Sequence, residues 1–225
     1  DEAALVIKSI TNACIGSGCA LLGGETAEMP GHYIGNNFDL AGFSVGCVDE
    51  KKILNNENVK IGNVLLGIES SGPHSNGFSL IRKIINDSKA PKNEIKEMVN
   101  KALMPTILYP SLIMDLIKNF SINSISHITG GGLLENLPRS IPKDLSIEID
   151  TKSWKIPKIF RWLQDEGNVP QDEMYRIFNC GIGMVLFVDE KDSSEIRDKI
   201  LEKNYKCFEI GKVCKNKSDN LIEFI

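Results

Sequence analysis

The chain has 225 residues, of which 42% are hydrophobic and 25% charged, and 26 Lys and Arg against 30 Asp and Glu give a formal net charge of −4. This composition is typical of a globular protein long enough to bury a core without disulfides or metal ions. The acidic balance, with no basic run longer than Lys212–Lys217, argues against a nucleic-acid-binding protein.

The first predicted element is an amphipathic helix over residues 2–16. Apolar side chains recur at helical spacing from Ala4 to Cys14, and the pattern stops near Gly16. Because the pattern is already under way at Asp1 and no initiator Met precedes it, we expect the chain to be part of a longer protein.

Two strands are predicted after this helix. Residues 19–24 form a short apolar run that leads into a glycine-rich loop, and residues 38–48 alternate enough to be a second strand. Residues 49–60 are charged and rich in Asn, which marks a boundary between two folding units. The sequence therefore predicts a domain boundary within residues 49–60.

The second unit begins with a buried strand over residues 64–68, which breaks at Ser70–Pro73. A helix follows from Phe78, with Ser75 as a possible N-cap, and residues 87–101 form a loop or an exposed helix. The remaining pattern predicts helices over 112–120, 156–163 and 192–203, a strand, glycine turn and short helix over 124–139, and strands over 145–149, 181–188, 206–213 and 220–225. Interleaved strands and helices indicate α/β or α+β layers with helices flanking a sheet.

Three glycine-dense turns follow apolar runs, at Gly23–Gly31, Ser70–Gly77 and His127–Asn136. A glycine turn that leads into a helix exposes backbone N–H groups, and the helix dipole adds partial positive charge, so such a turn suits a phosphate. The alternative for each turn is a purely structural helix stop. None of the three matches the Walker or the Rossmann pattern.

Polar side chains border these turns. Glu25 and Glu28 place two carboxylates three positions apart, and Mg²⁺ prefers one or two carboxylates together with substrate phosphates, so Glu25 near a nucleotide is chemically reasonable. Alternatively, Glu28 caps a helix or faces solvent. His74 and His127 each border a glycine turn, either as site residues or as structural hydrogen-bonding groups.

The six cysteines form no C-x-x-C pair. Cys180 has no visible base beside it in the sequence and lies in an apolar run, which favours a structural cysteine over a nucleophile. No run approaches 18 apolar residues and none is typical of a signal peptide, so we expect a cytoplasmic protein without a membrane partner.

Five motifs together resemble the aminoimidazole ribonucleotide synthetases, also called phosphoribosylformylglycinamidine cyclo-ligases: GGETAEMPG, SSGPHSNGFSLIRK, ITGGGLLENLPR, EMYRIFNCGIGM and IGKV. The resemblance runs from about residue 2 to residue 224. It implies a C–N bond-forming ligase that closes the imidazole ring of purine biosynthesis from formylglycinamidine ribonucleotide, using ATP and Mg²⁺. It also implies a cytosolic homodimer, in which each subunit has two α/β domains.

The resemblance also implies roles for residues of this sequence. It gives catalytic roles to Glu25, His74 and Asn76, with Glu25 also binding the metal ion. It gives nucleotide or phosphate contacts to Gly23, Gly24, Thr26, Glu28, Ser75, Thr129, Gly130, Gly131 and Gly132. His127 and Asn179 are weaker matches.

The family's N-terminal part is absent from this sequence. The resemblance therefore makes residues 1–51 the end of an N-terminal ATP-binding domain and residues 52–225 a whole C-terminal domain, and we expect the chain by itself to be inactive. Two rival readings stay open. One is another ATP-dependent member of the wider superfamily that phosphorylates a different small molecule, and the other is a non-catalytic module that binds phosphate or dimerises.

Overall fold

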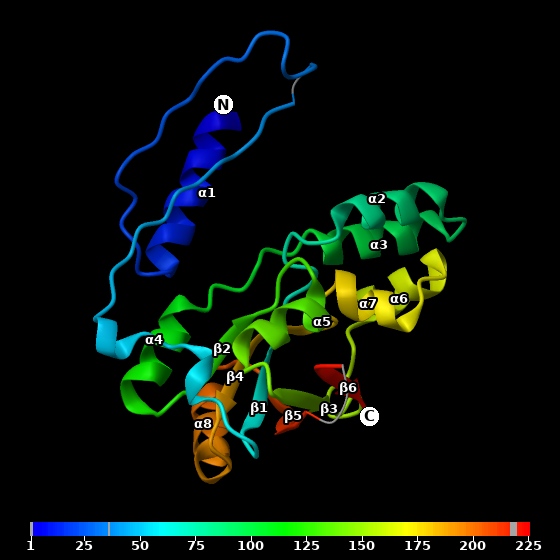
Figure 1. Ribbon diagram of the computed structural model, residues 1–225. Helices are drawn as coiled ribbons and strands as arrows, with labels where there is room; N and C mark the ends of the chain where they lie inside the picture. The colour runs from blue at the N-terminus through cyan, green and yellow to red at the C-terminus, as the bar shows by residue number, and fades with distance from the viewer. Residues whose placement is uncertain (1, 36, 217–219) are drawn as a thin grey trace. The chain divides into compact units, whose positions relative to one another are not determined.

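The computed structural model describes residues 2–35, 37–216 and 220–225. The chain divides into two compact units, Asp1–Ile53 and Leu54–Ile225, and each is described here by itself (Figure 1).

The first unit consists of one long helix and a segment with little regular structure. Helix α1 (Glu2–Gly16) confirms the predicted helix. The chain then passes through turns near Pro30–Tyr33 to a short 3₁₀ helix, η1 (Glu50–Lys52), whose N-cap Asp49 accepts a hydrogen bond from the Lys51 amide at 2.9 Å.

The two strands predicted in this unit, over residues 19–24 and 38–48, are wrong. Neither stretch forms a strand, and their apolar side chains are exposed, with Phe43 and Val45 at 102% and 96% of full accessibility. An apolar run favours a strand only where a second strand supplies a hydrogen-bonded ladder. Among the described residues of this unit, no segment supplies that ladder.

In the second unit, the described residues form one six-stranded mixed sheet in the order β2-β4-β1-β5-β3-β6. The strands are β1 (Val64–Glu69), β2 (Ser124–His127), β3 (Leu145–Ile149), β4 (Ile182–Val188), β5 (Cys207–Lys215) and β6 (Ile222–Phe224). Neighbouring strands are antiparallel except β3 and β6, which are parallel. The predicted layered fold with a mixed sheet is confirmed, and each of these six strands overlaps a predicted strand.

The helices of this unit mostly fall where the apolar periodicity puts them: α2 (Phe78–Asp87), α3 (Lys92–Ala102), α4 (Pro110–Asn119), α5 (Gly132–Asn136), α6 (Lys158–Gly167), α7 (Gln171–Ile177) and α8 (Glu190–Glu202), with 3₁₀ turns η2 (Asn56–Asn58) and η3 (Leu137–Ser140). The stretch 87–101, predicted as a loop or an exposed helix, is mostly helix α3, whose Met98 is buried. The pattern does not predict α7, because its seven residues are too few to show a helical period.

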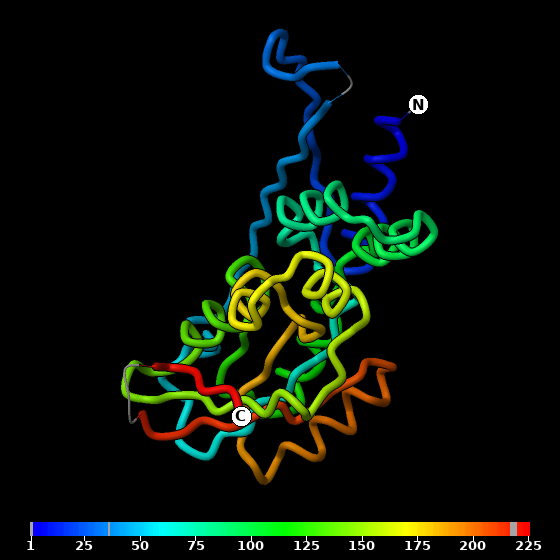
Figure 2. Tube along the Cα trace, turned by 90° about the vertical axis from the view of Figure 1, so that its right-hand side faces the viewer, coloured from blue at the N-terminus to red at the C-terminus, as the bar shows by residue number. Residues whose placement is uncertain are grey.

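Each face of the sheet is covered by its own helices. Along β1, Val64, Leu66 and Ile68 point toward α4 and α8, while Leu65 points toward the cluster that includes α5, α6 and α7. Figure 2 shows α6 and α7, in yellow, on the side of the strands away from α8, in orange. Because side chains alternate along a strand, burial on both faces requires the nearly continuous apolar sequence of β1 and β4.

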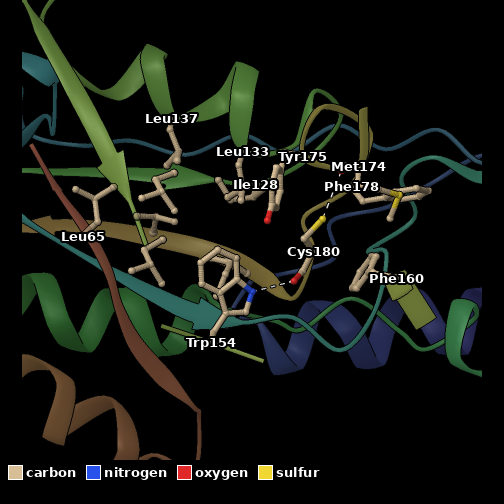
Figure 3. Packing of buried hydrophobic residues seen from close by; sticks show 14 of the residues in the cluster. Leu65, Ile128, Leu133, Leu137, Trp154, Phe160, Met174, Tyr175, Phe178 and Cys180 are labelled. Atoms are coloured by element: carbon tan, nitrogen blue, oxygen red, sulfur yellow. Dashed lines mark hydrogen bonds between the residues drawn. The ribbon is translucent and has the colours of Figure 1, made fainter. Parts of the chain in front are cut away.

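The core next to α5 and α7 contains Cys180 (Figure 3). Its thiol lies 3.4 Å from the Met174 carbonyl oxygen, and its own carbonyl accepts a hydrogen bond from the Trp154 indole at 3.0 Å. Burial raises the pKa of the Cys180 thiol to about 12. The prediction of a structural cysteine is confirmed, because a buried thiol that stays protonated is a poor nucleophile.

Within the part of the chain that the structure describes, none of the helices combines the length and the apolar character that a membrane crossing requires.

Candidate functional site

Three segments that are distant in sequence meet at one end of the sheet. Strands β1 and β2 both pair with β4 in antiparallel register, so the carboxyl ends of β1 and β2 lie beside the amino end of β4. The Ser70 amide donates to the Gly181 carbonyl at 2.9 Å, and the Ile128 amide donates to the Gly183 carbonyl at 3.0 Å. The second and third glycine turns of the sequence are therefore neighbours.

The second turn, Ser70–Gly77, has an unusual backbone. His74 and Ser75 have φ values of 51° and 60°, in the left-handed region that non-glycine residues rarely adopt, and Gly77 follows with φ 72°. Such conformations cost free energy and persist where surrounding contacts impose them. The Asn76 side chain supplies one of these contacts, because its amide donates to the His74 carbonyl at 2.7 Å.

The predicted N-cap of α2 is wrong. Gly77, not Ser75, is the N-cap, and no side chain caps this helix. A Cβ atom on Gly77 would lie 2.4 Å from the Phe178 ring, so both packing and backbone conformation require glycine there. The first amides of α2, a helix of ten residues, consequently face the turn without a side-chain cap.

The third turn, Thr129–Gly132, is held by a buried asparagine that the sequence reading did not single out. The Asn136 amide donates to the carbonyls of Gly132 at 2.7 Å and Gly130 at 3.1 Å. The Gly132 amide donates to the Thr129 carbonyl at 3.0 Å. The signal in the sequence was an Asn four residues after the last of three glycines, at the end of a very short helix.

The three glycines of this turn have different surroundings. A Cβ on Gly132 would lie 2.2 Å from the Tyr175 carbonyl oxygen, and one on Gly131 would lie 2.7 Å from a Glu135 carboxylate oxygen. A Cβ on Gly130 would meet only the Asn76 side chain, at 3.5 Å. Gly130 is therefore the glycine of this turn with free space beside it, and its nearest neighbour, Asn76, belongs to the second turn.

The expected helix dipole is weak at the third turn. Helix α5 has only five residues, so its aligned peptide dipoles sum to little, and the Glu135 carboxylate lies beside Gly131. An anion at this turn would depend on individual backbone amides and on the Thr129 hydroxyl.

Asn179 joins the second turn to the start of β4. Its side-chain oxygen accepts from the Ser70 hydroxyl at 2.8 Å and the Gly181 amide at 2.9 Å, and its amide donates to the Gly72 carbonyl at 2.8 Å. The side chain is buried and uses its hydrogen-bonding groups on the protein itself. Asn179 thus acts as a structural support of the turn.

Three aromatic rings lie close together beside these turns. The Tyr109 ring centroid lies 6.0 Å from those of both His74 and His127, and the Tyr109 hydroxyl donates to the Glu69 carbonyl at 2.6 Å. Burial and, to a smaller extent, the charge of His127 lower the pKa of His74 to about 4. Burial also lowers the pKa of His127. Sequence reasoning did not single out Tyr109, which lies 35 positions after His74.

The first glycine turn belongs to the other unit. Residues 23–29 have no helix or strand, and all of these residues are exposed, including Glu25, Thr26 and Glu28. A Cβ atom added at Gly23 or Gly24 would meet nothing within 4 Å, so packing inside this unit does not require glycine there. Glycine at these positions is consistent with close approach of a ligand to the backbone.

The described residues contain no group of three or more His, Cys, Asp and Glu side chains that could hold a metal ion. Glu25 and Glu28 remain two exposed carboxylates on one short segment. That donor set fits Mg²⁺, which keeps several waters and substrate phosphates in its shell and needs only one or two carboxylates from the protein. It does not fit a Zn²⁺ site, which needs three or four protein ligands.

Comparison with known proteins found a matching family model and similar curated proteins. Residues 60–223 match the family model described as "AIR synthase related protein, C-terminal domain". The chain is 48% identical over 222 residues to the phosphoribosylformylglycinamidine cyclo-ligase of Geobacter metallireducens, covering 96% of this chain and 64% of that protein. For the protein of the same name from Citrifermentans bemidjiense the identity is 46% over 221 residues, covering 95% and 63%. The chain thus spans somewhat under two thirds of these relatives.

Solved structures share the fold at low sequence identity. A thiamine-monophosphate kinase from Stenotrophomonas maltophilia matches with a TM-score of 0.54 and 14% identity, covering 79% of this chain and 54% of that one. E. coli HypE matches with a TM-score of 0.53 and 14% identity, covering 76% and 48%. At this identity the likeness concerns the fold alone.

Proposed function

This chain belongs to the AIR synthase related protein family, and from that premise we propose that it is part of an ATP-dependent cyclo-ligase of purine biosynthesis. In the proposed reaction, the formyl amide oxygen of formylglycinamidine ribonucleotide receives a phosphoryl group from ATP. The amidine nitrogen then attacks the formyl carbon, and phosphate leaves with the former formyl oxygen. The products are aminoimidazole ribonucleotide, ADP and phosphate, and the bond formed is a ring C–N bond.

One observation carries the proposal. Curated relatives named phosphoribosylformylglycinamidine cyclo-ligase are 44–48% identical to this chain over about 95% of its length. Because the chain spans 63–64% of those relatives, activity, substrate and partners are proposed for the whole protein. The isolated chain is proposed to be inactive.

The second unit would bind and orient the substrate through its two turns. The open backbone at Gly130, with the Thr129 hydroxyl beside it, suits an anionic or carbonyl oxygen, and the Asn76 side-chain oxygen that faces Gly130 can accept from an N–H group of the substrate. Gly131, Gly132 and Ser75 shape the two turns around these contacts. Rigid donors of this kind act by positioning and by electrostatic stabilisation, which is most of what phosphoryl transfer requires of a protein.

The first unit would contribute nucleotide contacts. We assign the backbone of Gly23 and Gly24 and the side chain of Thr26 to nucleotide phosphate, and Glu25 to the metal ion, with Glu28 as the second acid. Mg²⁺, when bound, would neutralise negative charge on the transferring phosphoryl group. Under this proposal residues 1–51 are the end of an ATP-binding domain and residues 52–225 a complete C-terminal domain.

Partners and location follow from the same proposal. We propose a homodimer in the cytoplasm, with a small-molecule substrate and no nucleic-acid or membrane partner. The net charge of −4 supports the part of this proposal that excludes nucleic acid.

The test completes the chain with the residues that the Geobacter metallireducens relative has and this chain lacks, and measures ADP release. We expect ADP only when formylglycinamidine ribonucleotide, ATP and Mg²⁺ are all present, and none from the 225-residue chain alone. ADP release with thiamine monophosphate instead would favour a different small-molecule kinase. A non-catalytic module would be favoured by two results together: calorimetry detects phosphate binding to the 225-residue chain, and the completed protein never releases ADP.

A further inference from the structure

His74 lies in the strained turn of the candidate site and is almost wholly buried, at 4% exposure. A histidine in such a place has two distinct possible uses. It can transfer protons as a general acid or base, or it can hold neighbouring groups in position as a neutral ring. The contacts of its two nitrogens distinguish these uses.

The Nε2 atom of His74 faces two backbone donors. The Ser71 amide lies 3.1 Å away and the Ile107 amide 3.4 Å away, both aimed at this nitrogen. A backbone N–H can only donate, so Nε2 must carry a lone pair and no proton. The neutral ring therefore carries its proton on Nδ1.

The Ser71 hydroxyl also lies near this nitrogen. It is 3.0 Å from Nε2 and 2.6 Å from the Pro105 carbonyl oxygen, so its one hydrogen can serve either acceptor, and the two backbone amides alone assign the tautomer. The hydrogen bonds of Ser71 and His74 thus tie the turn Ser70–Gly77 to the segment Pro105–Ile107, more than thirty positions away in the sequence.

Protonating Nε2 would place its hydrogen against the hydrogens of the two amides and break both contacts. The Nδ1–H group has no hydrogen-bond partner among the described residues. A buried donor of this kind needs an oxygen acceptor from water or a ligand, and it has no lone pair to offer a metal ion.

We propose that His74 is a positioning residue that works as a neutral Nδ1–H imidazole, locking the turn Ser70–Gly77 onto Pro105–Ile107, and that it takes no part in proton transfer. The importance of this turn for catalysis rests on the proposed function. The protonation state assigned to each His74 nitrogen rests on the hydrogen bonds alone. It revises the catalytic role that the resemblance gave to His74. It also accounts for the left-handed backbone at His74 and Ser75, because the hydrogen bonds to Nε2 offset the free-energy cost of that conformation.

The first test is ¹⁵N NMR of the histidine rings in the 225-residue chain, with His74 identified by its absence in His74→Gln. We expect the Nε2 resonance in the range of an unprotonated ring nitrogen and the Nδ1 resonance in the protonated range at neutral pH. An Nε2 resonance in the protonated range would overturn the proposal, whatever the protein's activity.

The second test compares three variants. The Gln carboxamide reaches the position of Nε2 and its oxygen can accept from both amides, whereas Asn reaches only the position of Nδ1 and Leu offers no acceptor. We expect the melting temperature of His74→Gln to stay near that of the parent, and those of His74→Asn and His74→Leu to fall together by several degrees.

Turnover of the completed protein gives the decisive comparison between positioning and proton transfer. We expect His74→Gln to retain kcat within about threefold of the parent with an unchanged pH profile. A folded His74→Gln protein that loses activity as fully as His74→Leu would overturn the positioning role. If the completed protein has no cyclo-ligase activity, the function proposed above fails, while the NMR and melting measurements still decide the role of His74.

Discussion

The side-chain oxygen of Asn179 accepts a hydrogen bond from the Ser70 hydroxyl at 2.8 Å, across a separation of 109 residues. This contact joins the turn after β1 to the residues that lead into β4. Both side chains are buried, so the contact belongs to the framework that holds the second glycine turn in place.

Replacing Asn179 with Ala tests that framework. The change leaves the Gly181 amide and the Gly72 carbonyl without their partner, and buried groups in that state cost about 1–3 kcal/mol each. We expect the free energy of unfolding in urea to fall by about 3 kcal/mol. Asn119→Ala is the matched control, because Asn119 is exposed and its hydrogen bonds go to Asp115, one turn earlier on α4, so the change should alter stability little. Equal effects of the two changes would show that Asn179 is not a framework residue.

Gly130→Ala and Gly132→Ala separate binding from folding in the third turn. A Cβ on Gly132 would lie 2.2 Å from a backbone oxygen in a left-handed conformation, so Gly132→Ala should lower the melting temperature strongly. A Cβ on Gly130 has ordinary contact distances, so Gly130→Ala should melt like the parent. If Gly130 approaches an anion, calorimetry of Gly130→Ala should show weaker phosphate binding; unchanged binding would remove Gly130 from the site.

The pKa of His74 predicts a pH dependence of stability. Burial, with a smaller contribution from His127, lowers this pKa from 6.5 to about 4 in the folded chain. The unfolded chain therefore takes up a proton near pH 6.5 while the folded chain stays neutral at His74. The stability due to the neutral ring is complete above pH 6.5 and is lost as the pH falls toward 4.

The measurement is urea unfolding of the parent and of His74→Gln at several pH values between 4 and 8. Other groups also titrate in this range, so the informative quantity is the difference between the two proteins. We expect the parent to lose stability more steeply below pH 6.5. Parallel curves would mean that His74 titrates normally in the folded state.

Cysteine alkylation should distinguish the buried from the exposed thiols. Burial raises the pKa of Cys180 and of Cys207 to about 12, so almost no thiolate forms at pH 8. Cys19 and Cys47 are exposed. Iodoacetamide followed by peptide mass spectrometry should modify Cys19 and Cys47 first, and Cys180 only after unfolding. Early modification of Cys180 in the folded chain would contradict its place in the core.

Glu25→Gln tests the metal role in the completed protein. The side chain is exposed in its unit, so the substitution should leave the melting temperature unchanged. Removing a carboxylate ligand should raise the Mg²⁺ concentration needed for half-maximal ADP release by about tenfold or more. Glu57→Gln is a control at another exposed carboxylate. An unchanged Mg²⁺ titration for Glu25→Gln would exclude Glu25 as a metal ligand.

The strands of the second unit were predictable because β1 and β4 are short and almost wholly apolar and are bounded by glycines or polar residues. The strands expected over residues 19–24 and 38–48 were not, because an apolar run does not say whether a partner strand lies beside it. Helix α7 escaped prediction for a related reason: its buried Met174 and Tyr175 adjoin each other, and two such residues define no period.

The sequence by itself determined which residue types border the glycine turns and how strands and helices alternate, because both depend on local pattern. Only the tertiary structure decided that Ser70–Gly77, Thr129–Gly132 and Asn179 share one end of a sheet, since antiparallel pairing with β4 brings them together. It also decided that Gly132 is required by packing while Gly130 is open, and that two backbone amides point at the Nε2 atom of His74. Those properties depend on neighbours distant along the chain, and no local pattern of residues records them.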